Sequence, residues 1–484
     1  MTKKNYSKYE AKEELVTLSF NHVLLHKKDT KIYQVIFLSL LNSRKSRFSD
    51  GLRGGVTVLL LFLCTISYGI EIAKTQNVIL TSKVYDHLAY NRFFECFNSV
   101  VTGIDIQLRR KEDTNIYLVN GLSKSKEKVF TIKADDIIPE KMQYHALGTI
   151  EIGINEFLAI DGNLFYGTDI DKNNVPGAEF LQDDGKWSSI NEKLGFAYSL
   201  YYYFPEENKI GKSFSIMANS IGTDNFVTRV NRHYIQRMQT AMGMSLFGRA
   251  TKGGATVIYD LLKDHNGFTA ESRIHSLYSE KGQQPDFIFV AGGINDFLTN
   301  ETYGSKNFIR NAEIGTWVDD FGSLRNDGTF YEAYEYLMFQ LKELYPKSKI
   351  VCLTPMKTYT TKGCYSHDPF INDYGINLED FVNAEKDICN RMNIDVIDMF
   401  TLFPINQDNK YEITVDCLHP NDTGYAFIEK AIWDYLKQEK NSTGIRPVIK
   451  NKEKNNGKIY NLNGIMTNKK EGIYIVNRKK YIRN

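Results

Sequence analysis

The sequence predicts an α/β protein with a parallel sheet flanked by helices, preceded by a smaller all-β, sandwich-like domain. Between residues 211 and 440, continuous apolar runs alternate with helical runs, a pattern typical of a parallel sheet covered on both faces. Between residues 71 and 208, short runs of β-branched and aromatic residues are separated by Gly, Asn, Asp and Lys clusters, without helical runs between them. We therefore expect two folded domains of different class.

The charge of the chain is unevenly distributed. Residues 1–55 hold 11 Lys and Arg against 5 Asp and Glu, and residues 441–484 hold 11 against 2. Because the formal net charge of all 484 residues is only +2, the body between these ends is acidic. Its apolar fraction of 42% is that of a globular protein. An acidic folded body argues against nucleic acid as a partner.

Residues 1–70 resemble a basic leader. Arg44, Lys45 and Arg47 precede an apolar run at 56–66, which small residues follow up to Gly69. Positive charge, about ten apolar residues and small residues are the layout of a secretory signal peptide, here with cleavage after Gly69. The run is shorter than the roughly 20 residues of a transmembrane helix. We expect export to the periplasm, cell surface or medium, with an uncleaved membrane anchor as the alternative.

Residues 71–208 are expected to form the all-β accessory domain. The predicted strands lie at 98–106, 115–119, 128–133, 148–154, 157–160 and 198–204. No residue set in this part has the spacing of a catalytic or metal site. The domain is interpreted either as a structural spacer or as a carbohydrate-binding or substrate-presenting module, ending near 205–208.

Residues 211–440 are expected to alternate strands with helices. The strands are predicted at 212–219, 286–291, 349–355 and 395–397, and the helices at 227–242, 330–344, 378–392 and 421–436. Because parallel strands place their carboxyl ends at one edge, residues that follow these strands are candidates for a ligand crevice.

Four segments at such positions carry groups suited to acyl transfer. Ser220 follows the first strand, and His419 stands three residues after Asp416, which supplies a base and its orienting partner. A glycine turn expected to lead into a helix offers the backbone N–H of Gly254, and a later turn offers the amide of Asn295. Together with the Ser220 N–H, these donors could hold an oxyanion. Each segment alone is more often a helix cap or a tight turn, but their joint occurrence in this order favours an acyl-transfer site.

On these residues, 211–440 resemble an SGNH (GDSL-type) hydrolase. The resemblance implies Ser220 as nucleophile, His419 and Asp416 as the base pair, and Ser220, Gly254 and Asn295 as oxyanion donors. It further suggests three weaker substrate-pocket residues: Asn219, Asp296 and Trp317.

The sequence departs from the family pattern beside the nucleophile. The usual Gly-Asp-Ser block is replaced by Ala218, Asn219 and Ser220, and Cys417 stands where the last block usually has glycine. An asparagine keeps the side-chain acceptor of aspartate but loses its charge. Activity would survive if only hydrogen bonding is needed and would fall if the charge is needed.

We expect a serine esterase that hydrolyses O-acyl esters, in particular acetyl esters on carbohydrates, through an acyl-enzyme intermediate. The alternatives are a catalytically degenerate, carbohydrate-binding surface protein and an esterase acting on lipid or peptidoglycan esters. No metal or cofactor is expected, because no Cys/His cluster has zinc-ligand spacing and no glycine-rich phosphate loop is present.

Residues 441–484 form a basic linker followed by two short β runs, at 457–464 and 470–480. This tail resembles the C-terminal sorting domains of the type IX (Por) secretion route, with a small β-hairpin or basic tail as the alternative. The resemblance supports export. Attachment to a membrane or cell surface, through the N-terminal segment or the C-terminal tail, is a separate expectation.

Overall fold

A computed structural model describes residues 73–75, 83–167, 177–190, 195–259, 267–298, 313–360, 369–372 and 375–441, together with strands at 459–461, 472–476 and 479–483. The chain divides into two compact units, Met1–Ala73 and Lys74–Asn484. The predicted leader at 1–70 lies outside the described residues. Within the part that is described, no helix has both the length and the apolar character needed to cross a bilayer.

A five-stranded sheet occupies the centre of residues 211–440, and all four of its strand pairings are parallel. Its spatial order is β15-β14-β16-β17-β18. The strands are β14 (Ser213–Ala218), β15 (Ser245–Thr251), β16 (Phe287–Ala291), β17 (Lys349–Leu353) and β18 (Asp395–Ile397). The predicted parallel sheet is therefore confirmed, with β14 at its second position.

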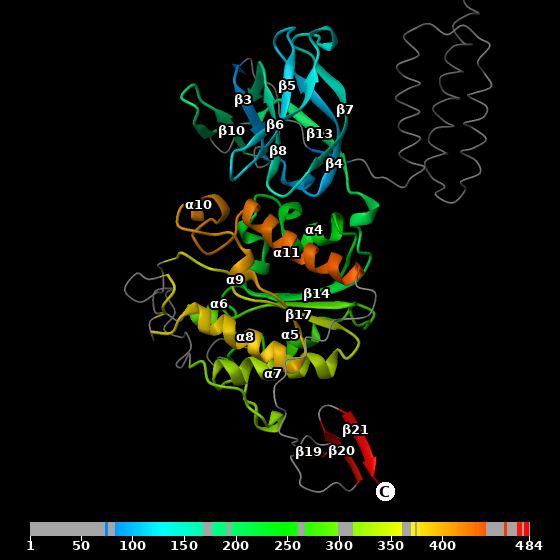
Figure 1. Cartoon of the computed structure of the whole chain (residues 1–484), viewed down its shortest axis with the longest axis vertical. Coiled ribbons are helices and arrows are strands. Elements are labelled where there is room, and N and C mark those ends of the chain that lie inside the picture. Colours follow the sequence, from blue (N-terminus) through cyan, green and yellow to red (C-terminus); the bar gives the residue numbers. More distant parts are fainter. Residues whose placement is uncertain are drawn as a thin grey trace, which may run out of the picture. The chain divides into compact units, whose positions relative to one another are not determined.

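Helices cover both faces of this sheet (Figure 1). One face carries α4 (Tyr234–Thr240) and α11 (Asp422–Asn441), and the other carries α5 (Glu271–His275), α7 (Phe330–Leu344) and α8 (Leu378–Met392). Strand residues alternate between the two cores: Met217 packs in the α7–α8 core and Ile216 in the α4–α11 core. This two-sided burial explains why the strands are continuous apolar runs.

Short helices complete this part of the fold: α6 (Ile294–Phe297), α9 (Met399–Leu402) and α10 (Lys410–Ile413). Two long helices, α7 and α8, occupy the predicted ranges, and each begins with a capping box. Thr329 and Glu332 form the first box, and Asn377 and Asp380 form the second.

Two local predictions were wrong. The helix predicted at 227–242 is a 3₁₀ turn, η6 (Val230–Arg232), followed by the shorter α4, which His233 caps through its ring nitrogen. The glycine turn before Gly254 follows an unpredicted edge strand, β15, and does not lead directly into a helix. Strand β15 escaped prediction because its partly exposed sequence lacks the apolar continuity of the central strands.

The N-terminal part is antiparallel and all-β, as predicted, and its strands form three sheets. Their orders are β1-β13-β4-β7, β11-β10-β3-β8-β5-β6 and β12-β9-β2. The strands are β1 (Ala73–Lys74), β2 (Lys83–Tyr85), β3 (Leu88–Asn91), β4 (Ser99–Gln107), β5 (Thr114–Asn120), β6 (Lys126–Ile132), β7 (Met142–Ile152), β8 (Glu156–Asp161), β9 (Leu164–Gly167), β10 (Ala178–Leu181), β11 (Trp187–Ile190), β12 (Gly195–Phe196) and β13 (Tyr198–Tyr203).

A buried arginine joins this all-β region to the parallel-sheet region. Arg237 on α4 pairs with Glu429 on α11 at 3.1 Å and donates hydrogen bonds to the carbonyls of Glu95 and Phe97. Ala426 on α11 packs into the same aromatic core as Phe97. The buried ion pair joins α4 to α11, and breaking such a pair costs about 3–5 kcal/mol. The hydrogen bonds to the Glu95 and Phe97 carbonyls connect the same guanidinium to the all-β region.

Near the C-terminus, β19 (Ile459–Asn461), β20 (Gly472–Val476) and β21 (Lys479–Arg483) form an antiparallel sheet in that order. The type IX sorting resemblance of this tail stays a prediction.

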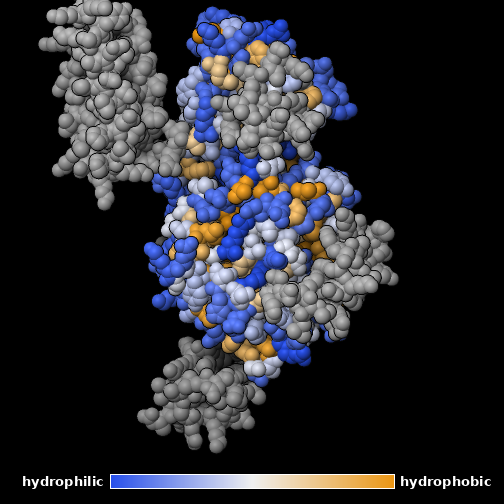
Figure 2. Space-filling view, turned by 180° about the vertical axis from the view of Figure 1, so that it is seen from behind, coloured by the Kyte–Doolittle hydropathy of each residue, from blue (hydrophilic) through white to orange (hydrophobic). Residues whose placement is uncertain are grey.

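On the face drawn in Figure 2, hydrophobic side chains lie in separate patches among hydrophilic ones.

Candidate active site

Ser220 lies where β14 ends, as the first residue of the 3₁₀ turn η4 (Ser220–Gly222). The side-chain oxygen of Asn219 caps this turn by accepting a hydrogen bond from the Ile221 N–H at 2.9 Å. Asn219 therefore supplies a hydrogen bond that closes the turn carrying Ser220.

Ala218, the other departure from the Gly-Asp-Ser block, is fully buried. Its methyl group faces Gly222, where an added Cβ would lie only 2.6 Å from the Ala218 Cβ. The larger residue at position 218 is thus accommodated because residue 222 has no side chain.

The three residues Ser220, His419 and Asp416 form a connected chain of hydrogen bonds. The distance from Ser220 Oγ to His419 Nε2 is 2.9 Å, and that from His419 Nδ1 to Asp416 Oδ2 is 2.8 Å. A carboxylate can only accept, so Nδ1 carries the ring proton and Nε2 is free to accept from the serine hydroxyl. The arrangement is that of a nucleophile, its base and an orienting carboxylate.

Asp416 also shapes the loop that carries the histidine. Its Oδ1 atom accepts the backbone N–H groups of His419 at 2.7 Å and Leu418 at 3.2 Å. Burial by itself raises the pKa of Asp416, but the hydrogen bonds from the His419 side chain and backbone outweigh it and hold the pKa below its ordinary value. The carboxylate therefore stays ionised beside the imidazole.

Cys417, within the same loop, has a φ of 66°, in the left-handed region that favours glycine. Its carbonyl accepts hydrogen bonds from the Tyr359 N–H and the Thr358 hydroxyl, both at 2.9 Å. These contacts hold the cysteine in a conformation that glycine adopts without strain.

The two predicted oxyanion segments are joined by one side chain. The Asn295 amide donates to the Ala255 carbonyl at 2.8 Å, in the loop that contains Gly254. Gly254 has a φ of 71°, and an added Cβ on neighbouring Gly253 would lie 4.0 Å from the Ser220 Cβ. The glycine loop therefore lies directly beside the serine, as an oxyanion-binding loop requires.

Asp296 lies behind this loop and is fully buried, so it does not line an open pocket as the sequence suggested. Its carboxylate accepts the N–H groups of Val257, at 2.9 and 3.0 Å, and of Ile258, at 3.0 Å. Burial raises its pKa to about 7 in spite of these bonds, which lower it. Asp296 fixes the continuation of the glycine loop.

Trp317 also lies away from the catalytic residues. Its indole N–H donates to Asp319 at 3.1 Å, and its ring contacts the Arg391 guanidinium and the Phe321 ring. The indole packs against the α7–α8 core. These contacts account for Trp317 by packing.

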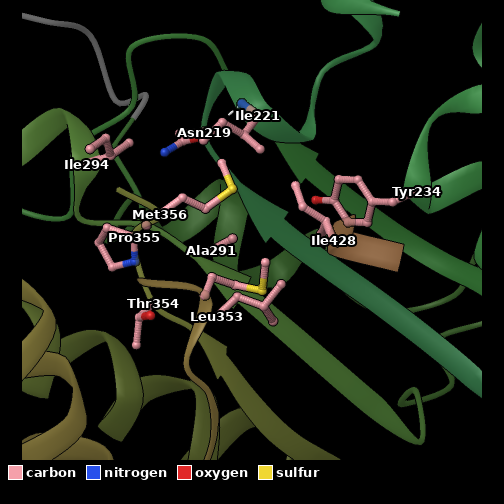
Figure 3. Close-up of a pocket in the computed structure, with 12 residues that line it drawn as sticks. Asn219, Ile221, Tyr234, Ala291, Ile294, Leu353, Thr354, Pro355, Met356 and Ile428 are labelled. Atoms are coloured by element: carbon pink, nitrogen blue, oxygen red, sulfur yellow. Dashed lines mark hydrogen bonds between the residues drawn. The ribbon is translucent and has the colours of Figure 1, made fainter. Parts of the chain in front are cut away.

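A small pocket of about 30 Å³ lies at the carboxyl ends of β14, β16 and β17. Asn219 and Ile221, the neighbours of Ser220, form part of its wall. In Figure 3 the Met356 side chain extends toward Asn219, with Tyr234 and Ile428 on the opposite side. The volume suffices for a group of a few heavy atoms, since one water needs about 10–15 Å³ on this measure.

Two further residues at the site were not predicted from the sequence. The Phe226 ring stacks on His419, with 3.8 Å between ring centroids and 13° between planes. The buried Arg273 guanidinium donates to the carbonyls of Ala218 and Ala250, tying the ends of β14 and β15 together. Neither residue belongs to a local motif, so no sequence spacing predicts its contact.

One part of the chain is similar to a known protein family. Residues 215–427 match the GDSL-like Lipase/Acylhydrolase family. The GDSL-like match covers less than half of the 484 residues and includes all three members of the hydrogen-bonded chain. No curated protein matches the sequence.

Among the described residues, no group of three His, Cys, Asp or Glu side chains could hold a metal ion.

Solved structures resemble the GDSL-like part at low identity. A possible lipase from Chitinophaga pinensis DSM 2588 is 22% identical, covering 47% of this chain and 99% of its own, with a TM-score of 0.34. The lipase/acylhydrolase from Enterococcus faecalis is 16% identical, covering 47% and 96%, with a TM-score of 0.31. An acetyl xylan esterase is 20% identical, covering 46% and 98%, with a TM-score of 0.30. At these values none of the three bears on this protein's substrate.

Proposed function

We propose that this protein is a serine esterase that hydrolyses short O-acyl esters, in particular acetyl esters on carbohydrates. The observation that carries the proposal is the unbroken chain from Ser220 Oγ through His419 to Asp416, with both distances below 3.0 Å. Hydrogen-bond reach between nucleophile, base and orienting group is what nucleophilic acyl transfer needs.

In the proposed mechanism, Ser220 Oγ attacks the ester carbonyl carbon while His419 Nε2 takes the hydroxyl proton. The N–H groups of Ser220 and Gly254 and the amide of Asn295 hold the oxyanion of the tetrahedral intermediate. The C–O bond then breaks, and the alcohol leaves with the proton from His419 Nε2. A water molecule attacks the acyl-enzyme by the same route, releasing the acid and regenerating Ser220.

The size of the acyl group is proposed from the pocket beside the nucleophile turn. The pocket of about 30 Å³ that Asn219, Ile221 and Met356 help to line has room for a group the size of acetyl. Ser220 itself is not part of its wall. The carbohydrate alcohol rests on the resemblance to esterases of this family and on the acidic, aromatic-rich body of the chain.

Acetate release from an O-acetylated xylo-oligosaccharide tests the proposal. Wild type should release acetate, and Ser220→Ala should release none while keeping the same midpoint of thermal unfolding. A folded wild type that releases no acetate but does release longer acids from lipid or peptidoglycan esters would replace the substrate part of the proposal.

A binding protein without activity is the second candidate, favoured by the left-handed Cys417 and the altered Ala218–Asn219 pair beside the nucleophile. It predicts that wild type and Ser220→Ala bind the acetylated oligosaccharide equally and that neither turns it over. Calorimetric titration of both proteins with this oligosaccharide separates the two candidates.

A further inference from the structure

The stacking of Phe226 on His419 covers one face of the imidazole. The two rings are nearly parallel, 13° apart, and their centroids are 3.8 Å from each other. The hydrogen bonds to Ser220 and Asp416 both lie in the imidazole plane, so they leave the ring free to tilt about the line that joins its partners. An aromatic ring against the face removes that freedom.

The stack also matters for the charge that His419 acquires. When Nε2 takes the serine proton, the imidazole becomes a cation, and the face of a phenyl ring carries negative electrostatic potential. A cation within about 6 Å of a ring centroid is attracted to the ring, and more strongly where water is excluded. The neutral imidazole gains less from this attraction, so the interaction favours the transition state over the ground state.

Phe226 is held in place from both sides along the chain. Two residues before it, Asp224 accepts two hydrogen bonds from the Arg249 guanidinium, at 2.8 and 2.9 Å. Two residues after it, the Thr228 N–H donates to Asp422 at 2.9 Å. Asp224 and Thr228 are thus each anchored to a residue distant in sequence, which fixes the backbone segment that carries Phe226.

The Asp422 carboxylate also links the Phe226 segment to the loop that carries His419. Asp422 begins α11, three residues after His419, and also pairs with Arg232 at 2.9 Å. Arg232 in turn lies 3.5 Å from Glu95, and Arg229 lies 3.6 Å from Glu95, in the all-β region. The segment bearing Phe226 and the segment bearing His419 therefore share one anchor, which the all-β region contacts.

We propose that Phe226 is a positioning residue that fixes the plane of the His419 imidazole and stabilises its charged form during acyl transfer. The inference rests on the proposed function, because it takes His419 to be the base.

Fluorination of the ring tests the electrostatic part without changing its shape. Wild type and variants with mono-, di- and trifluorophenylalanine at position 226 are compared in kcat and KM for p-nitrophenyl acetate. Each added fluorine weakens the negative face, so kcat should fall stepwise, to about one tenth at the third fluorine, with KM unchanged. Phe226→Trp should retain activity, since Trp is the best cation–π partner, and Phe226→Leu should lose at least tenfold.

A matched control is Phe339 on α7, whose ring stacks on Phe321 with 14° between planes, away from the catalytic residues. The same fluorinated series at position 339 should leave kcat unchanged. A flat kcat across the series at position 226, with turnover intact in wild type, would overturn the inference and leave the proposed function standing.

A second readout is independent of turnover. In Ser220→Ala labelled with ¹³C-histidine, the ring current of Phe226 should shift the His419 carbon-bound protons upfield, and Phe226→Leu should remove this shift. Equal His419 shifts in both proteins would contradict the stack itself. Absence of turnover in wild type, with the stack present, would instead contradict the proposed function.

Discussion

The contacts of Asp416 separate its chemical role from its structural one. Oδ2 accepts from His419 Nδ1, while Oδ1 accepts two backbone N–H groups in the same loop. In Asp416→Asn, the oxygen can keep the backbone bonds, but the amide N–H₂ faces Nδ1 and forces the ring proton onto Nε2. Nε2 can then no longer accept from Ser220, and kcat/KM should fall about 10³- to 10⁴-fold.

The two substitutions at Asp416 should also differ in how much they lower the free energy of unfolding. Asp416→Asn keeps both backbone hydrogen bonds but loses the stabilising charge, so at pH 7 its stability should lie between those of wild type and Asp416→Ala. Asp416→Ala loses both, and at about 0.5–1.5 kcal/mol each it should be about 1–3 kcal/mol less stable. Because the pKa of Asp416 is lowered in the folded protein, its ionisation stabilises the fold above about pH 4, and that contribution is lost as the pH falls further.

The measurements are steady-state hydrolysis of p-nitrophenyl acetate and urea unfolding of all three proteins. Wild-type turnover in Asp416→Asn would refute the tautomer argument. Equal unfolding of the Asn and Ala variants would refute the account of the loop.

Two further pairs of variants test the pocket and the turn at Gly293, which caps α6 two residues before Asn295. Gly293→Ala places a Cβ 2.3 Å from the buried Glu385 side chain, at a φ of 84°. Its free energy of unfolding should fall by about 2–4 kcal/mol, and most turnover should be lost. Gly282→Ala, with a φ of 72° and open space around the added Cβ, should lose about 1 kcal/mol of stability and no turnover. Equal losses in urea unfolding would contradict the turn's role. Met356→Ala enlarges the pocket, so the ratio of kcat/KM for butyrate to kcat/KM for acetate should rise about tenfold. Met338 is buried on the opposite face of the sheet. Met338→Ala should therefore also destabilise the fold but leave this ratio unchanged. An unchanged ratio in Met356→Ala would remove this pocket from the substrate argument.

The sequence predicted the parts of the fold that local patterns determine. Helices α7 and α8 were placed at their observed bounds because capping residues and apolar periodicity agree there. Strand β15 was missed because an edge strand does not require two apolar faces. The prediction of a helix over 227–242 was wrong at its start. Asp224, just before this range, and Thr228, within it, form hydrogen bonds to partners distant in sequence, and these bonds hold the segment in turns.

The candidate site was predicted from residue types at strand ends, since parallel strands bring their carboxyl ends to one edge. The structure brings Ser220, Asp416 and His419 into contact and links Asn295 to the loop of Gly254. Phe226 could not be predicted, because a ring contact between residues 193 positions apart leaves no periodic signal in the sequence. The assigned roles, the leader and the sorting tail stay predictions.

Covalent labelling with a fluorophosphonate probe tests the central claim most directly. Incubation of wild type, Ser220→Ala and His419→Ala should label wild type alone, and mass spectrometry of the digested protein should place the adduct on Ser220. A folded wild type that stays unlabelled, or an adduct on another residue that Ser220→Ala retains, would contradict the assignment of Ser220 as the nucleophile of a serine esterase.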